Sequence, residues 1–210
     1  GVSINEYLVA VYVWSVYTEC MHGMPSERPV RVAVPVNLRP YFNSITTKNF
    51  FVMVSAEFHP TKEIYTFEEV LKSVSESLRS QISRENLEKL FSYNVSNEKL
   101  LAARIVPLFL KNLAMRYVYT TSALANTATV TNIGNISVSE EYRPYVEMFH
   151  AFLAMSKGQH LKGTICSYGD TLVFSFSYDL TDTSVQRGFF RKIAADGIAV
   201  EIETNGVNYE

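Results

Sequence analysis

Three short polar patches stand where predicted β-strands begin or end, and they contain the side chains best suited to chemistry. The patches are Asn37-Leu38-Arg39-Pro40, Asn49-Phe50-Phe51 and Thr131-Asn132-Ile133-Gly134-Asn135. Loops at strand ends are where a rigid scaffold presents functional groups. An arginine in a proline-fixed turn can bind a carboxylate with two hydrogen bonds. Asn, Gly and Pro also favour ordinary turns, so the patches fit either a binding site or turn chemistry.

Other motifs of enzyme chemistry are absent from the sequence. It has no phosphate-binding loop of the GxGxxG or GxxxxGK[ST] type and no GxSxG nucleophile elbow. The four histidines are His22, His59, His150 and His160. None is paired with another histidine or a cysteine at metal-ligand spacing, so no metal site is expected. His150 lies in an apolar stretch and is predicted to be a core residue.

The composition indicates the broad class of protein to which the chain belongs. The chain has 210 residues, 19 basic and 21 acidic side chains, a formal net charge of −2 and 47% hydrophobic residues. These values predict one folded domain over residues 1–210 and exclude intrinsic disorder. The near-neutral charge argues against a nucleic-acid partner. The longest apolar run, Tyr7 to Tyr17, is too short for a membrane span, which needs about 20 residues.

The cysteines and the first residue bear on where the chain works and whether it is whole. Cys20 and Cys166 form no CxxC or Cys/His motif, which favours free, buried thiols in a reducing, cytoplasmic environment. The first residue is Gly1 and not Met, and a predicted helix follows almost at once. We therefore expect a piece of a longer protein.

Hydrophobic patterns of strand and helix period alternate along the chain. Ser3 and Thr66 each begin a capping box, which marks the start of a helix. Strands are expected at 30–36, 50–58, 127–133, 148–155, 161–167, 171–179 and 198–202, and helices at 4–17, 67–82, 84–120 with a break at Pro107, and 183–196. Because both faces of 50–58 are partly apolar, we expect that strand in the centre of the sheet. The pattern predicts an α/β fold: a two-layer sandwich with a mixed, largely antiparallel β-sheet covered by helices.

Together, the patches resemble parts of the chloramphenicol acetyltransferase-like superfamily. Val34-Pro35-Val36-Asn37-Leu38-Arg39-Pro40, followed by Asn49-Phe50-Phe51, is similar to one segment of these proteins, and Thr131-Asn132-Ile133-Gly134 is similar to their Ser-Asn-x-Gly strand end. The helix over residues 2–17 is similar to the one that begins their second half. The superfamily includes condensation domains, wax-ester and polyketide-associated acyltransferases, and bacterial alcohol acetyltransferase-like proteins. The motif order agrees over residues 2–204.

The resemblance implies the C-terminal half of a two-half acyltransferase, with a tunnel between the halves. The catalytic histidine would belong to an HHxxxD motif in the N-terminal half, and this sequence contains no such motif. The implied co-substrate is acyl-coenzyme A, and the acceptor is a small alcohol or amine. Arg39 would pair with the Asp of that motif. Asn37, Asn49, Thr131 and Asn132 would line the tunnel mouth or steady the oxyanion and the thioester.

The resemblance also implies partners. A half without its partner is expected to expose an apolar face, so we expect it to associate with the N-terminal half, or with another copy of itself, through that face. Arg39 is expected to present its guanidinium at the open edge and not in an internal ion pair. Two alternatives stay open: a non-catalytic binding or scaffold domain of the same fold, and part of a peptide-synthetase condensation domain. An HHxxxD motif upstream of Ser3 would favour the enzyme over the binding domain.

Overall fold

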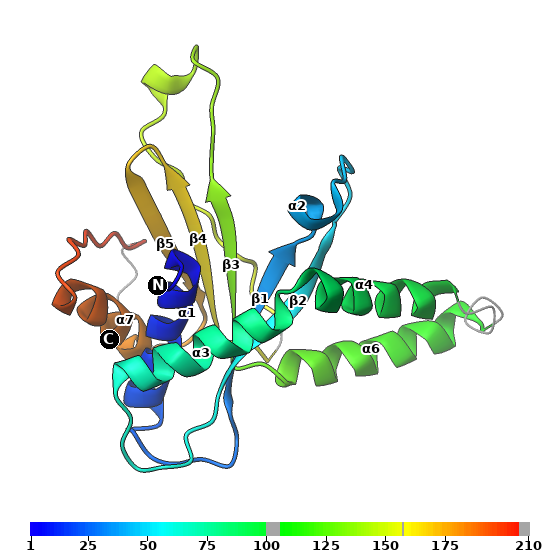
Figure 1. The fold of residues 1–210 in the computed structure, drawn as a ribbon, viewed down its shortest axis with the longest axis horizontal. Coiled ribbons are helices and arrows are strands. Elements are labelled where there is room, and N and C mark those ends of the chain that lie inside the picture. The colour runs from blue at the N-terminus through cyan, green and yellow to red at the C-terminus, as the bar shows by residue number, and fades with distance from the viewer. Residues whose placement is uncertain (100–105, 157, 206–210) are drawn as a thin grey trace.

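Five strands form one mixed sheet in the computed structural model, which describes residues 1–99, 106–156 and 158–205 (Figure 1). Their order across the sheet is β2 (Phe51–Phe58), β1 (Val30–Asn37), β3 (Ala128–Asn135), β4 (Leu161–Tyr168) and β5 (Thr171–Tyr178). β1 pairs with β2, and β4 with β5, in antiparallel register, whereas β3 runs parallel to both β1 and β4. The predicted mixed α/β fold is confirmed, and antiparallel pairing joins two of the four neighbouring strand pairs.

Three helices cover one face of this sheet. They are α1 (Ile4–Ser15), α3 (Phe67–Gln81) and α7 (Ser184–Ala195), and α1 continues into a π-helical turn, η1 (Val16–Cys20). The capping boxes of Ser3 and Thr66 are both formed, so the first backbone N–H groups of α1 and α3 are satisfied. Between helices and sheet lies the core, in which Tyr12, Phe58 and Phe189 are fully buried.

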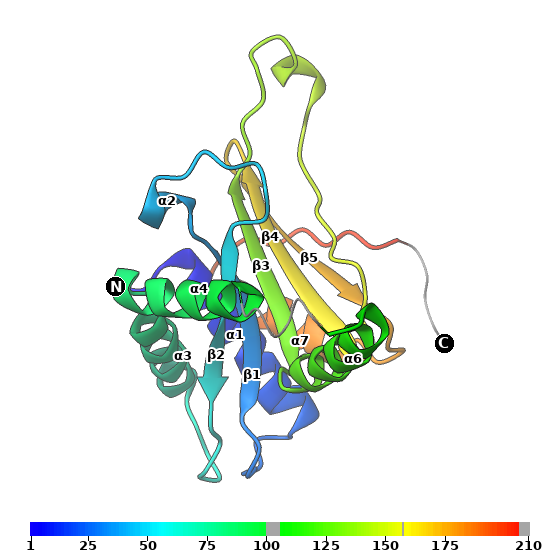
Figure 2. The same cartoon turned by 90° about the vertical axis from the view of Figure 1, so that its right-hand side faces the viewer.

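The remaining helices lie outside this layer. The short α2 (Arg39–Phe42) follows β1, and the 3-10 turn η2 (Arg143–Tyr145) lies in the long connection from β3 to β4. α4 (Arg84–Lys99) and α6 (Leu108–Leu124) project beyond the sheet, with the predicted break at Pro107 between them. Figure 2 shows α4 and α6 in front of the sheet and α1 and α7 behind it. Within the described ranges, no helix is both long and apolar enough to cross a membrane.

The prediction that strand 50–58 is central was wrong, because β2 lies at an edge of the sheet. One of its faces carries Val52, Val54, Ala56 and Phe58, which are buried under the helical layer. The opposite face carries Phe51 and Met53, which are about half exposed. The second apolar face therefore reflects exposed hydrophobic side chains and not burial on both sides.

Two predicted strands, 148–155 and 198–202, are not strands in the structure. The first segment lies against β4, where Phe149 O accepts a hydrogen bond from Cys166 Sγ at 3.1 Å and Ala154 O accepts one from Lys162 Nζ at 2.7 Å. Because β3 and β5 already occupy both edges of β4, this segment has no free edge of β4 with which to pair. In the second segment Val200 packs against the core while Ile198 and Ile202 are exposed, so the three alternating side chains do not form one buried face.

Candidate functional site

The three polar patches lie at one edge of the sheet, where β1 and β3 end and β2 begins. Strands β1 and β3 are parallel, so both carboxyl ends lie at the same edge of the sheet. Their pairing covers Val32 with Ala128 and Ala33 with Thr129, after which the strands diverge (Figure 1). From β1 the chain passes to β2 on one side, and from β3 it passes to β4 on the other. In open α/β sheets such a switch point, at the carboxyl ends of the strands, is the usual place for a ligand.

Arg39 is the first residue of α2, and its guanidinium holds the loop that joins β1 to β2. Nε donates to Thr46 O at 3.1 Å, and Nη2 donates to Lys48 O at 2.7 Å. Nη1 donates to Asn37 Oδ1 at 3.2 Å. These bonds use three of the five N–H groups of a guanidinium. No ion pair to Arg39 is found among the described residues.

Asn37 ends β1 and orients the turn. Its Oδ1 accepts from the backbone N–H of Arg39 at 3.1 Å as well as from the guanidinium. Asn37 is exposed, and none of the hydrogen bonds found among the described residues is donated by its amide nitrogen.

Thr131 and Asn132 occupy the corresponding end of β3. Asn132 Oδ1 accepts from the backbone N–H of Gly134 at 2.8 Å, across a β-bulge that leaves Ile133 as an extra residue. Gly134 has a φ of 84°, a left-handed conformation that favours glycine. As at Asn37, the side-chain oxygen accepts from a backbone N–H of its own turn, and within the described ranges no hydrogen bond from the amide nitrogen is found. Thr131, half-buried, faces the side of the sheet opposite α1 and α7, in register with Thr164 of β4.

The structure brings the first two patches into direct contact. Leu38 N donates to Phe50 O at 3.1 Å, and the Arg39 bond to Lys48 O ends next to Asn49. Asn49 is exposed, and the third patch stands across the gap between β1 and β3. The sequence did not identify the carbonyl groups of Thr46 and Lys48 as partners of Arg39, because every residue type carries the same backbone carbonyl.

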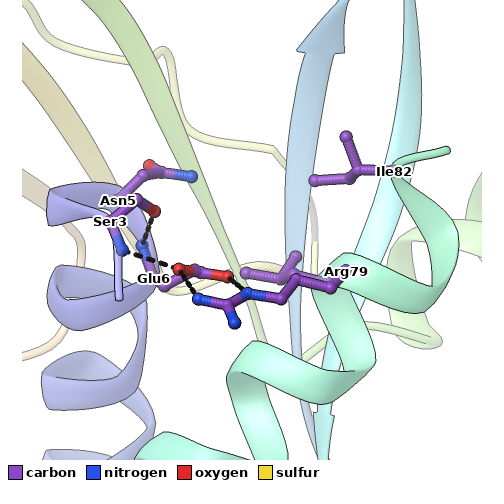
Figure 3. Close-up of a pocket in the computed structure, with 6 residues that line it drawn as sticks. Ser3, Asn5, Glu6, Arg79 and Ile82 are labelled. Atoms are coloured by element: carbon purple, nitrogen blue, oxygen red, sulfur yellow. Dashed lines mark hydrogen bonds and ion pairs between the residues drawn. The ribbon is translucent and has the colours of Figure 1, made fainter. Parts of the chain in front are cut away.

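A hollow of about 220 Å³ beside the start of α1 is a second polar site (Figure 3). There Arg79 Nη2 donates to Glu6 Oε2 at 3.0 Å and to Gly1 O at 2.8 Å, while Glu6 Oε2 also accepts from Ser3 N at 2.7 Å. The bond from Arg79 lowers the pKa of Glu6 to about 2. Such a carboxylate stays ionised near neutral pH and is a poor general base. We therefore assign this cluster to stabilising the fold.

A second hollow, of about 390 Å³, lies at the amino ends of β1 and β3 and is lined in part by Arg28 and Arg31. Arg31 Nε lies 2.9 Å from Glu57 Oε1, and His59 Nε2 lies 3.4 Å from the other oxygen of that carboxylate. The charge of Arg31 is thus largely balanced by Glu57. This hollow is at the opposite end of β1 from the three polar patches.

The histidines and cysteines partly depart from expectation. The core position predicted for His150 was wrong: its side chain is exposed and lies 3.5 Å from Glu203. Free thiols are confirmed, but only Cys166 is buried, whereas Cys20 is exposed. Burial raises the pKa of Cys166. In the part of the chain that the structure describes, no three His, Cys, Asp or Glu side chains are placed to hold a metal ion.

Comparison with known proteins gives matches among solved structures alone. No family model and no curated protein matches the chain. It is similar to a wax ester synthase/diacylglycerol acyltransferase from Marinobacter aquaeolei VT8, with 14% identity and a TM-score of 0.46 over 94% of this chain and 44% of that one. It is also similar to a condensation domain of the enacyloxin polyketide synthase, with 12% identity and a TM-score of 0.47 over 96% of this chain and 38% of that one. The chain spans less than half the length of either.

Proposed function

We propose that this chain is the C-terminal half of an acyltransferase that moves an acyl group from a coenzyme A thioester to an alcohol or amine. The hydroxyl or amine attacks the thioester carbonyl carbon, the carbon–sulfur bond breaks, and the acceptor's proton passes through a general base to the thiolate. The resemblance implies that this base is the histidine of an HHxxxD motif in the N-terminal half. This half supplies hydrogen-bond donors and an arginine, not the base.

The unused hydrogen-bonding capacity of Arg39 is the observation that best supports the proposal. Three N–H groups fix the guanidinium against its own loop, and two remain for another group. An arginine held in this way is ready to bind a carboxylate with little further loss of side-chain entropy. The Asp of an HHxxxD motif is the carboxylate that the resemblance assigns to it.

The amide groups of Asn37 and Asn132 fit the thioester side of the reaction. Both side-chain oxygens are satisfied by backbone N–H groups of their own loops. By the strand register, Asn37 lies on the sheet face of Phe51, whereas Asn132 lies on the opposite face with Ile165. Each is a candidate donor, on its own face of the sheet, to a carbonyl oxygen that gains negative charge during attack. Thr131 and Asn49 would line the same entrance.

Exposed apolar side chains surround this end of the sheet and suit a covering partner. Ile45 is 99% exposed in the loop that Arg39 holds, and Phe51, Met53 and Ile133 are each about half exposed. Apolar groups beside fixed polar ones are typical of a protein–protein interface. We propose the N-terminal half as the partner that covers them, with a second copy of the chain taking its place when that half is absent.

The full open reading frame and Arg39 variants of its product test this function. An HHxxxD motif upstream of Ser3 is expected, and its absence would leave a non-catalytic binding domain as the better reading. In the full-length protein, release of coenzyme A thiol is measured with acyl-coenzyme A and a panel of alcohols and amines. Arg39→Ala is expected to lower kcat/KM on the order of 100-fold through misplacement of the catalytic motif. Arg28→Ala, at the opposite end of β1, is the matched control, and wild-type turnover by Arg39→Ala would remove Arg39 from the site.

A further inference from the structure

Lys162, near the start of β4, is a buried cation without an ionic partner in the part of the chain that the structure describes. Its residue is 6% exposed. Nζ donates to Ala154 O at 2.7 Å and to Ser156 Oγ at 2.6 Å, and both of these acceptors are neutral. None of the ion pairs found among the described residues includes Lys162. Buried charges in folded proteins are as a rule paired with an opposite charge, so this ammonium lacks its expected partner.

A β-bridge between Ser156 and Gln159 places two more polar side chains beside this ammonium. Gln159 is 8% exposed, and its backbone N–H donates to Ser156 O at 3.0 Å. Gln159 Oε1 accepts from Thr129 Oγ1 at 3.4 Å, and Thr129 is in register with Lys162 across the sheet. The Lys162 and Gln159 side chains are therefore tied to the same place on the sheet by Thr129.

The unused hydrogen-bonding groups of this cluster are donors. An ammonium has three N–H groups, and Lys162 uses two of them within the described ranges. Gln159 uses its side-chain oxygen, and no acceptor for its Nε2 is found among the described residues. The Ser156 hydroxyl accepts from Lys162, so its own hydrogen remains to be donated. One charged and two neutral side chains thus offer donors for the same missing acceptor.

The cluster lies on the sheet face opposite the helical layer. Ala128 and Val130 pack in the core under the helices, so Thr129 between them faces the other way, and Lys162 shares its face. On that face Ala154, whose carbonyl group Lys162 contacts, is exposed, and Ser156 is half-buried. A small ion that approaches Ser156 from solvent therefore meets the cluster without entering the core.

We propose that Lys162, Gln159 and Ser156 bind phosphate, as the free ion or as the phosphate group of a small molecule. The Lys162 ammonium supplies the opposite charge, and the Gln159 amide and the Ser156 hydroxyl donate to further oxygens. A phosphate group has more oxygens than a carboxylate and can accept from all three side chains at once. The site is separate from the three polar patches, because Lys162 lies at the amino end of β4, whereas the patches lie where β1 and β3 end.

Isothermal titration calorimetry of the 210-residue chain, at an ionic strength held constant with sodium chloride, tests the proposal. The probes are inorganic phosphate, ribose 5-phosphate and acetate. We expect saturable binding of one phosphate per chain, with acetate weaker by about 10-fold because it reaches fewer of the donors. Tighter binding of ribose 5-phosphate than of inorganic phosphate would identify a phosphate ester as the ligand, and weaker binding would identify the free ion.

Two substitutions separate the charge from the neutral donors. Lys162→Met removes the ammonium and keeps an unbranched apolar side chain, and it is expected to weaken phosphate binding on the order of 30-fold. Gln159→Met removes a neutral donor and is expected to weaken it about 5-fold. Lys162→Met is expected to fold, because an apolar side chain does not carry the desolvation cost of a buried charge. Circular dichroism checks each variant, and Gln159→Met decides the test should Lys162→Met not fold.

Lys72→Met is the matched control, because it removes the same charge from an exposed position on α3, in the helical layer. It should bind phosphate like the wild type. No saturable phosphate binding by the folded wild type would overturn the proposal, as would undiminished binding by folded Lys162→Met. An equal loss in Lys72→Met would show an effect of net charge and would also overturn it. Acetate binding as tight as phosphate binding would overturn the assignment to phosphate.

Discussion

Replacing Glu6 by glutamine is expected to destabilise the fold at neutral pH and to have little effect near pH 2. Glu6 is buried, and its side chain accepts from Arg79 and from the backbone N–H of Ser3. Glutamine keeps the capping bond, because Gln also serves at that position of a capping box. What the variant removes is the charge that faces Arg79.

The pKa of Glu6 gives the size and the sign of this effect. Arg79 lowers that pKa from 4.5 to about 2 in the folded chain. A difference of this size corresponds to about 3 kcal/mol of stability. Because the Arg79 side chain is 57% exposed, water screens part of the attraction, and we expect about 2 kcal/mol. Since the folded pKa lies below the unfolded one, this stability is present above pH 4.5 and is lost as the pH falls toward 2.

Urea unfolding followed by circular dichroism measures this difference. The free energy of unfolding of the wild type and of Glu6→Gln is compared from pH 7 down to pH 2. The gap should close as Glu6 becomes protonated. Glu85→Gln, which removes an exposed carboxylate paired with Lys89, is the control and should show little gap at any pH. A gap that is absent at pH 7, or equally large at pH 2, would refute the role given to the ion pair.

Two further substitutions test the core by the same unfolding assay. The hydroxyl of Tyr12 is buried with no hydrogen-bond partner among the described residues, so Tyr12→Phe should be neutral or stabilising by about 1 kcal/mol, and a clear loss of stability would reveal a partner. A Cβ on Gly163 would lie 2.7 Å from Cζ of Phe174, so Gly163→Ala should cost about 1–3 kcal/mol, and wild-type stability would show that the ring can move aside.

Local sequence signals predicted much of the fold because short-range physics decides those elements. The capping boxes at Ser3 and Thr66 and the neighbouring strands predicted at 161–167 and 171–179 depend on residues a few positions apart. Burial depends on neighbours that are distant in the sequence, and the hydrophobic pattern did not predict it correctly for two segments. The apolar faces of 50–58 did not place β2 at an edge, and the apolar run 148–155 did not show that both edges of β4 were occupied.

The strand-end positions of the candidate residues were predictable from the sequence, but their arrangement in space was not. Strand-end Asn, Arg and Thr side chains are visible in the sequence, and each patch stands where a strand ends or begins. Their common position at one edge of the sheet depends on the parallel pairing of β1 with β3, across which Ala33 lies opposite Thr129. Nothing in the local sequence of either strand specifies that neighbour. The β-bulge at Ile133 was hidden for the same reason, since it is defined by the register with β4.

The contacts of Arg39 explain why the sequence could not decide between a turn residue and a binding residue. The guanidinium has enough N–H groups for both. Its bonds to Thr46 O, Lys48 O and Asn37 Oδ1 are turn chemistry, and they use three N–H groups. A lysine ammonium carries its three donors on one nitrogen and lacks the planar arrangement of Nε, Nη1 and Nη2 that spans these acceptors. An arginine holds the loop with three N–H groups and carries two more, which the proposed function assigns to a partner carboxylate. In the longer acyltransferase proposed above, Arg39→Lys keeps the charge but not the fork of N–H groups, so it should lose turnover while circular dichroism still shows a folded protein. Wild-type turnover by this variant would contradict the binding role proposed for Arg39.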